Sequence, residues 1–288
     1  MFRTLTTTLA ALAIAFAGLA LAQPALPQAA ADALAEGEAR MTEALATYEA
    51  QYPDRQLWQD AFAAGRRAMS LAPDRLEPVR FLAEAYSRSQ WTGPAWTTWQ
   101  DFVRRGGVLD EEDRGYAAGV GKRLAYGNYE AGNLDAALDR YVAVTELAPD
   151  DAEAHVWAGR ILVETERPEQ AIPYWRRALE LDPDDARAAY FLELAQEQAV
   201  WGSAAVNAFR AGVARYEEDR LSEAAERFAR ASTLNGSYVD AWAWLGRVAF
   251  EQGQYADAAT YYGSAARLAP DDDDIAYWVN EARRLAAP

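Results

Sequence analysis

Residues 134–149 read LDAALDRYVAVTELAP, and residues 168–183, which lie 34 positions further on, read PEQAIPYWRRALELDP. The two segments share a small residue, an aromatic residue, a leucine and a closing proline: Ala137 and Ala171, Tyr141 and Trp175, Leu147 and Leu181, Pro149 and Pro183. A third copy, YADAATYYGSAARLAP, occupies residues 255–270. A fixed step of this length predicts a solenoid, in which each repeat buries its apolar face only by stacking on its neighbours.

The step and its contents resemble the tetratricopeptide repeat family. The residues that carry the resemblance form three strings: Leu124-Ala125, Gly132, Ala137, Tyr141 and Pro149; Ala158-Gly159, Ala171, Trp175, Ala178 and Pro183; and Leu245-Gly246, Gly253, Ala258, Tyr262, Ala265 and Pro270. The resemblance covers roughly residues 42–288. It implies an all-α fold, a right-handed superhelical solenoid of helix-turn-helix repeats, whose concave wall is lined by one face of each first helix.

The copies have the composition of packed amphipathic helix pairs, with apolar residues at helical spacing. Small residues such as Gly159 and Gly246 allow two helices to approach closely, and large residues such as Trp175 and Tyr262 fill the gap to the next repeat. Pro-Asp-Asp strings, as at 149–151, separate the helices. Proline cannot continue the preceding helix, and aspartate accepts the free N–H groups of the next one.

Two interruptions divide the array. Pro73 and Pro149 are separated by two periods plus eight residues, and Pro183 and Pro270 by two periods plus 19. Eight residues lengthen a turn or a first helix, whereas 19 residues amount to one extra helix, which either caps one array or joins two. We predict these segments: two degenerate repeats at 42–109, an insertion at 110–117, two well-matched repeats at 118–185, an extra helix and a break at 186–204, two repeats at 205–272 and a C-terminal capping helix at 273–288.

The amino terminus has the pattern of a secretory signal peptide over residues 1–22. An apolar run occupies residues 9–21, and Ala20 and Ala22 are the small residues that cleavage requires. The alternative is an uncleaved membrane anchor, although the run is short for a bilayer span. Residues 23–41 are predicted to form a linker and a leading helix. The pattern favours a bacterial exported protein, periplasmic or secreted, with no stable membrane span after cleavage.

The composition restricts the possible partners. The chain has 288 residues, no cysteine, and 44 acidic against 28 basic side chains, which gives a net charge of −16. The absence of cysteine excludes disulfides, thiolate metal sites, a cysteine nucleophile and a lipoprotein anchor. The negative charge argues against nucleic acid, because phosphate contacts dominate that binding, and against an anionic lipid surface. The composition does not indicate an oligomeric state.

Signals for catalysis, cofactors and metals are weak, and we predict no residue for any of these roles. The single histidine, His155, is interpreted as a packed or half-exposed side chain on a first helix. Gly119–Lys122 lacks the first glycine and the closing Ser or Thr of a phosphate-binding loop. Asp271–Asp274 lacks the alternating spacing of a calcium loop and stands at a helix start, which favours capping.

The concave wall is the candidate site for a protein or peptide partner. The face that the resemblance assigns to it contains residues at i, i+4 and i+7 spacing: Lys122, Tyr126 and Tyr129; Val156, Arg160 and Val163; Tyr190 and Leu194; Phe209, Val213 and Tyr216; Arg247 and Phe250; and Tyr277. Aromatic residues and arginine dominate peptide-binding hot spots, and we expect Arg160 and Arg247 to pair with carboxylates of a partner. The alternative is that these side chains pack against neighbouring helices. Tyr126 and Trp157 stand where the family's clamp for carboxyl-terminal peptides has asparagine, so that activity is not expected.

A second candidate surface contains Trp91, Trp96 and Trp99. Trp91 and Trp96 flank a helix start as in a hydrophobic staple, which favours a structural role, whereas exposed tryptophans would stack on sugar rings. The sequence therefore predicts an exported scaffold or adaptor, not an enzyme, which binds a protein or peptide in its concave groove and takes part in assembly or organisation of the cell envelope. The alternative is a glycan- or peptidoglycan-binding envelope module.

The signal-peptide prediction has a direct test. We expect the mature chain to begin at Gln23, because Ala20 and Ala22 are the small residues before that bond. Mass spectrometry of protein recovered from the periplasm or the medium should show peptides that start at Gln23. Recovery of peptides that contain Met1 would show that the segment is retained.

Overall fold

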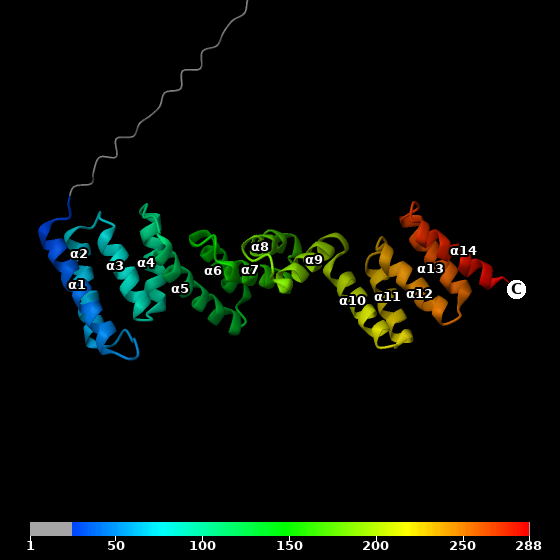
Figure 1. Cartoon of the computed structure of the whole chain (residues 1–288), viewed down its shortest axis with the longest axis horizontal. Helices are drawn as coiled ribbons and strands as arrows, with labels where there is room; N and C mark the ends of the chain where they lie inside the picture. The colour runs from blue at the N-terminus through cyan, green and yellow to red at the C-terminus, as the bar shows by residue number, and fades with distance from the viewer. Residues whose placement is uncertain (1–24, 288) are drawn as a thin grey trace, which may run out of the picture.

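The computed structural model describes residues 25–287, and within that range every regular element is a helix. The helices are α1 (Gln28–Thr47), α2 (Gln56–Leu71), α3 (Glu77–Arg88), α4 (Thr92–Arg104), α5 (Glu111–Glu130), α6 (Leu134–Leu147), α7 (Ala152–Glu164), α8 (Pro168–Leu181), α9 (Ala186–Trp201), α10 (Ser203–Glu217), α11 (Leu221–Leu234), α12 (Val239–Glu251), α13 (Tyr255–Leu268) and α14 (Asp273–Ala286). They stand side by side in one elongated row, with α1 at one end and α14 at the other (Figure 1). The predicted all-α repeat solenoid is confirmed.

The signal-peptide prediction at 1–22 lies outside the described residues. Within residues 25–287, no helix has both the length and the apolar character needed to cross a membrane.

Consecutive helices form pairs, and the pairs α7–α8, α10–α11 and α12–α13 each pack around a close contact between a glycine of the first helix and an aromatic ring of the second. A Cβ atom added to Gly159 of α7 would lie 2.8 Å from the ring of Trp175 on α8, and one added to Gly246 of α12 would lie 2.8 Å from the ring of Tyr262 on α13. Both rings are buried. The first helix of these pairs therefore carries glycine because the ring of the second helix lies directly against its backbone.

The second half of the solenoid duplicates the part before it. Helices α10–α14 match α5–α9 at a constant offset of 87 residues with no gap, as from Gly159 to Gly246 and from Trp175 to Tyr262. We call α5–α9 the first block and α10–α14 the second block. The duplication allows each side chain of one block to be compared with its counterpart in the other.

Two predicted boundaries differ from the helices. The boundary at residue 42 falls inside α1, which is the first helix of the first pair and packs on α2. The connection that contains Pro53 separates α1 from α2, so the proline interrupts no helix. The insertion at 110–117 forms the start of α5, where Asp110 caps the helix by accepting the N–H of Asp113, 2.9 Å away.

Helix α9 joins two groups of helices. Ala188 and Ala195 pack in the same core as Trp175, whereas Leu194 packs with residues of α10. In α14, the counterpart of Leu194 is Glu281, which is ion-paired with Arg284. A buried leucine allows α9 to carry the next helix, and a charged residue at the same position suits α14 to end the array.

The glycine contact leads to a stability prediction. Gly246→Leu should lower the free energy of unfolding by about 1–3 kcal/mol, because its side chain has to displace the buried ring of Tyr262. Denaturant unfolding measures the change. The control is Gly119→Leu, whose Cβ meets nothing within 4 Å. Equal midpoints for Gly246→Leu and the wild type would contradict this packing.

Candidate functional site: the groove between α7 and α9

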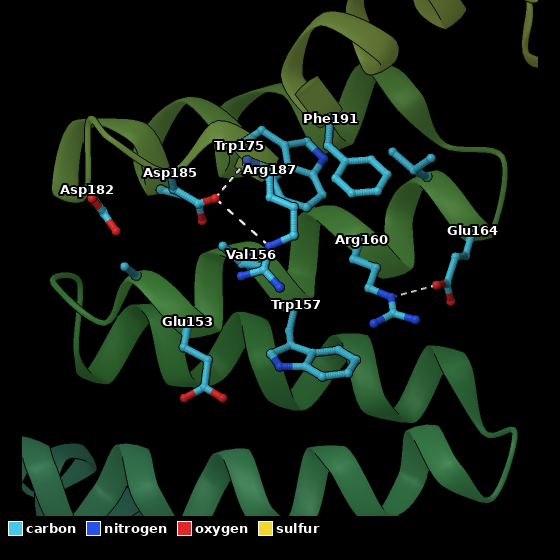
Figure 2. Close-up of a pocket in the computed structure, with 13 residues that line it drawn as sticks. Glu153, Val156, Trp157, Arg160, Glu164, Trp175, Asp182, Asp185, Arg187 and Phe191 are labelled. Carbon is cyan, nitrogen blue, oxygen red and sulfur yellow. Dashed lines mark hydrogen bonds and ion pairs between the residues drawn. The ribbon is translucent and has the colours of Figure 1, made fainter. Parts of the chain in front are cut away.

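A groove of about 510 Å³ lies between α7 and α9, with α8 as its floor (Figure 2). It is lined by Ala152, Glu153, Val156, Trp157, Arg160, Val163, Glu164, Trp175, Ala178, Asp182, Asp185, Arg187 and Phe191. The lining combines apolar side chains in the middle with charged side chains at both ends. A cavity of this size accommodates a small ligand or a few side chains of a larger one.

Two stacked ring pairs form the apolar part of the groove. Trp157 stacks on Tyr141, with ring centroids 5.6 Å apart, and Phe191 stacks on Trp175, with centroids 5.1 Å apart. Tyr141 and Trp175 are buried, whereas Trp157 and Phe191 are half-buried and line the groove. The buried ring of each pair therefore supports a partly exposed ring that offers apolar surface to a ligand.

Arg160 is held in place by its neighbours on α5 and α7. Its Nε donates to Glu164 at 2.7 Å and its Nη2 donates to the hydroxyl of Tyr129 at 2.9 Å, while its guanidinium lies 4.9 Å from the centroid of Trp157. The hydroxyl of Tyr129 donates in turn to Glu164. The bond to Glu164 raises the pKa of Arg160. These four residues form a cluster, the first clasp, that ties α5 to α7.

The second block contains the same cluster at the same offset. The guanidinium of Arg247 lies 5.0 Å from the ring centroids of Tyr216 and Trp244. Its Nε donates to Glu251 at 3.2 Å, and the Tyr216 hydroxyl donates to Glu251 at 2.6 Å. This second clasp ties α10 to α12. Each arginine already has a carboxylate partner within the chain, so the expected pairing with a partner's carboxylate is not required to balance its charge.

The space that forms the groove is filled in the second block. The counterparts of Val163 and Phe191 are Phe250 and Trp278, which are larger, and their ring centroids are 5.2 Å apart. Trp278 also stacks on Tyr262, as Phe191 does on Trp175. The same backbone arrangement therefore carries an open apolar surface in the first block and a ring contact in the second.

One end of the groove is acidic. Glu153, Asp182 and Asp185 surround it, with Arg187 as the cation that reaches over it (Figure 2). The Nε of Arg187 is 3.9 Å from Asp185, whose carboxylate caps α9. Glu153 pairs with Lys122 at 2.6 Å. Burial would lower the pKa of Lys122, but its bonds to Asp151 and Glu153 outweigh burial and raise it.

The comparisons with known proteins agree with this architecture. Two family models described as tetratricopeptide repeat match the chain, one at residues 123–186 and again at 158–199, the other at residues 215–278. The chain belongs to the tetratricopeptide repeat family. None of the curated proteins compared with the chain matches it. Tetratricopeptide repeat proteins are generally non-catalytic interaction scaffolds.

Several solved structures are similar to parts of this tetratricopeptide repeat protein. A tetratricopeptide repeat protein from Parabacteroides merdae is 13% identical, covers 89% of this chain and 100% of its own, and has a TM-score of 0.37. YrrB, described as a TPR protein with an unusual peptide-binding site, is 17% identical, with 77% and 98% coverage and a TM-score of 0.31. MamA is 22% identical, with 59% and 83% coverage and a TM-score of 0.27. With TM-scores this low, no conclusion about this chain follows from these likenesses.

The predicted wall residues fall into three groups in the tetratricopeptide repeat structure. Three of them line the groove: Val156, Arg160 and Val163. Three others stand beside it on α5: Lys122, Tyr126 and Tyr129. Four of the second block take part in the second clasp or in ring contacts around it: Tyr216, Arg247, Phe250 and Tyr277. The remaining four pack on α10 or its neighbours: Tyr190, Leu194, Phe209 and Val213.

Three of these predictions need correction. Leu194 is buried between α9 and α10, so it is not part of a wall open to a ligand. Phe209 packs among Phe228, Tyr238 and Trp244, and Val213 is partly buried against the same core. Because α9 and α10 adjoin without an intervening second helix, α10 meets side chains that would otherwise face the groove.

Sequence reasoning missed the two half-buried rings that line the groove. Trp157 and Phe191 are 34 residues apart, one position after Val156 and Tyr190. Trp244 and Trp278 recur at the same step. This recurrence was the available signal, since a helix face that includes these positions turns toward the second helix of the preceding repeat. No signal in the sequence pointed to Asp182, and Asp185 belongs to a Pro-Asp-Asp string that was interpreted only as a cap.

The tryptophan surface is structural. Trp99 is fully buried and donates its Nε1 hydrogen to Ser87 at 2.9 Å, and Trp96 is buried against α5. Trp91 packs back on Phe62 and Tyr86. The staple predicted between Trp91 and Trp96 is wrong, because the two rings contact different neighbours.

His155 has a structural role that its counterpart explains. It is buried, and its Nε2 lies 3.2 Å from the carbonyl of Pro149. Its counterpart Trp242 donates Nε1–H to the carbonyl of Gly236, the counterpart of Pro149, at 3.0 Å. The shared geometry indicates a neutral imidazole with its hydrogen on Nε2. Burial lowers the pKa of His155.

The two remaining motifs lie on helices. Gly119–Lys122 is inside α5, where the backbone N–H groups bond along the helix and are not free to hold phosphate. Asp272 caps α14 by accepting the N–H of Ile275 at 3.0 Å, in agreement with the capping interpretation of the aspartate run.

The duplication predicts how His155 can be replaced. The pKa of His155 is lowered in the folded state, so the unfolded chain binds a proton at this side chain more readily. The stability that the neutral imidazole contributes is therefore complete well above pH ~6.5 and is lost as the pH falls below it. His155→Trp keeps the N–H donor and removes this titration. Denaturant unfolding at pH 8 and pH 5.5 should show a smaller loss for His155→Trp than for the wild type. His155→Ala, which loses the donor, should be destabilised at both pH values. Identical pH dependence in the wild type and His155→Trp would contradict the assignment.

Proposed function

We propose that this tetratricopeptide repeat protein is an interaction scaffold that binds a segment of a protein or peptide in the groove between α7 and α9. The observation that carries the proposal is the contrast between the two blocks. Val163 and Phe191 leave a groove of about 510 Å³ between α7 and α9, whereas their larger counterparts Phe250 and Trp278 contact each other in the second block, with ring centroids 5.2 Å apart. A groove lined by apolar side chains with a few charged groups is the usual form of a ligand site.

The groove has the properties of a binding site with low ordering cost. The rings of Trp157 and Phe191 are held by stacking on buried partners, and the first clasp fixes Arg160 against Trp157. Side chains that are already immobilised lose little entropy when a ligand arrives. Tryptophan and arginine are also the residues that most often dominate binding energy. We therefore propose Val156, Arg160 and Val163 as contacts, with Lys122, Tyr126 and Tyr129 on the adjoining face.

The proposal includes export and an envelope role. It rests on the signal-like pattern of residues 1–22 and on the composition, since the chain has no cysteine and a net charge of −16. The glycan-binding alternative receives less support, because Trp96 and Trp99 are buried and present no ring face for a sugar. No reaction is proposed for this chain.

Filling the groove with the side chains of the second block tests the site. The double variant Val163→Phe and Phe191→Trp should remain folded, because the duplicate accommodates both residues. Its capture of envelope proteins should fall by at least about tenfold relative to the wild type, a loss of roughly 1.4 kcal/mol. Pull-down with quantitative mass spectrometry measures capture.

The matched control is the reverse exchange, Phe250→Val and Trp278→Phe, which leaves the first block unchanged. It should capture the same proteins as the wild type per folded molecule. If the filled variant captures them equally well, binding does not use this groove. If only the reverse exchange loses them, the second block is the site.

A further inference from the structure

We infer that the groove takes a peptide segment in which an apolar side chain lies next to a basic side chain, lysine or arginine. This inference rests on the proposed function and adds the chemistry of the ligand. The apolar side chain packs on Trp157 and Phe191, and the basic side chain faces the carboxylates of Glu153 and Asp182 at the acidic end of the groove.

The size of the groove sets the apolar part of the ligand. A volume of about 510 Å³ admits a few side chains but no folded domain. The surface at its centre consists of ring faces and aliphatic groups, with Val156 and Ala178 beside the two exposed rings. A linear segment with one or two apolar side chains fits this space.

The charges at the acidic end of the groove determine the second part of the ligand, its basic side chain. Glu153 shares Lys122 with Asp151, and Asp185 is committed to the cap of α9. Asp182 accepts only a backbone hydrogen bond, from Asp184 at 3.3 Å, and has no ion-pair partner among residues 25–287. The cation at this end is Arg187, whose exposed side chain makes one loose ion pair, 3.9 Å from Asp185. A ligand cation would meet an unpaired carboxylate there, and a ligand anion would meet repulsion.

The opposite end does not reverse this preference. Arg160 is paired with Glu164 and hydrogen-bonded to Tyr129, so its charge is neutralised within the chain. Figure 2 shows this pair on one side of Trp157 and the carboxylates of Glu153 and Asp182 on the other. The ligand therefore lies with its apolar side chain over the ring and its basic side chain toward Asp182.

The second block has a different arrangement of charges at this end. Asp182 has Ala269 as its counterpart, and Arg187 has Asp274. The end of α13 therefore lacks the carboxylate that Asp182 provides after α8, and a carboxylate stands in place of Arg187. The same comparison shows that alanine at position 182 is compatible with the backbone of this turn.

Three fluorescein-labelled decapeptides test the inference. They share a central Ile-Leu pair and differ only in the two residues that follow it, which are Lys-Lys, Gln-Gln or Glu-Glu. Fluorescence anisotropy with the full chain should show the lysine peptide binding at least about tenfold tighter than the glutamate peptide at low salt. The ratio should shrink at high salt, because the exposed charges are screened.

Variants at the acidic end of the groove show which carboxylate causes the preference for the lysine peptide. Asp182→Ala should reduce the preference for lysine at least about threefold at low salt, since it removes the unpaired carboxylate. The control Asp184→Ala makes the same change of charge two residues away, outside the groove lining, and should leave the preference unchanged. The filled variant, Val163→Phe with Phe191→Trp, should abolish binding of all three peptides.

The outcomes separate this inference from the proposed function. If the glutamine or glutamate peptide binds best and the filled variant abolishes binding, the groove is the site and the inferred ligand chemistry is wrong. If the peptides bind the filled variant as well as the wild type, the inference and the proposed site both fail. If no peptide binds the wild type, the inference is wrong, and the protein-capture experiment alone decides the function.

Discussion

The close approach of a glycine backbone to an aromatic ring is the contact on which this solenoid depends. Gly159 against Trp175, and Gly246 against Tyr262, bring the two helices of a pair near enough for a large buried ring to fill the space between them. The same rings then support the residues that follow, since Trp175 carries Phe191 and Tyr262 carries Trp278. One contact therefore holds the pair together, transmits the stacking to the next helix and positions the ring that lines the groove.

The duplication shows how a repeat scaffold can be specialised without a change of fold. Both blocks keep the glycine contact and the clasp of tyrosine, tryptophan, arginine and glutamate. They differ in side-chain volume at Val163 and Phe191, and in charge at Asp182. Changes at these positions leave the helix packing intact, because the side chains lie on the open face. The first block thereby forms the groove, and in the second block the larger rings contact each other at the same positions.

The positions and charges of Arg160 and Arg247 are determined by residues that contact them within the chain. In an acidic chain, Arg160 and Arg247 suggest binding sites for anions, yet each is already bonded to a glutamate four residues along its own helix. Their stacking on Trp157 and Trp244 makes them part of the wall. The groove between α7 and α9 is consequently apolar at its centre and negative at one end, which is the opposite of a site for carboxylate ligands.

The sequence by itself determined the repeat, the all-α fold, and the helix pairing from residue 118 onward. The period and the alternation of small and large residues express local geometry that every copy must satisfy. It also placed Val156, Arg160 and Val163 on the side of α7 that lines the groove, because i, i+4 and i+7 residues share a helix face. Only the tertiary structure decided which faces stay open. Leu194 shares a helix face with the exposed Tyr190 but is covered by α10. Trp157 lines the groove because Tyr141 supports its ring from another helix. Burial depends on which helix arrives next to a face, and that is a property of the packed array rather than of any one repeat.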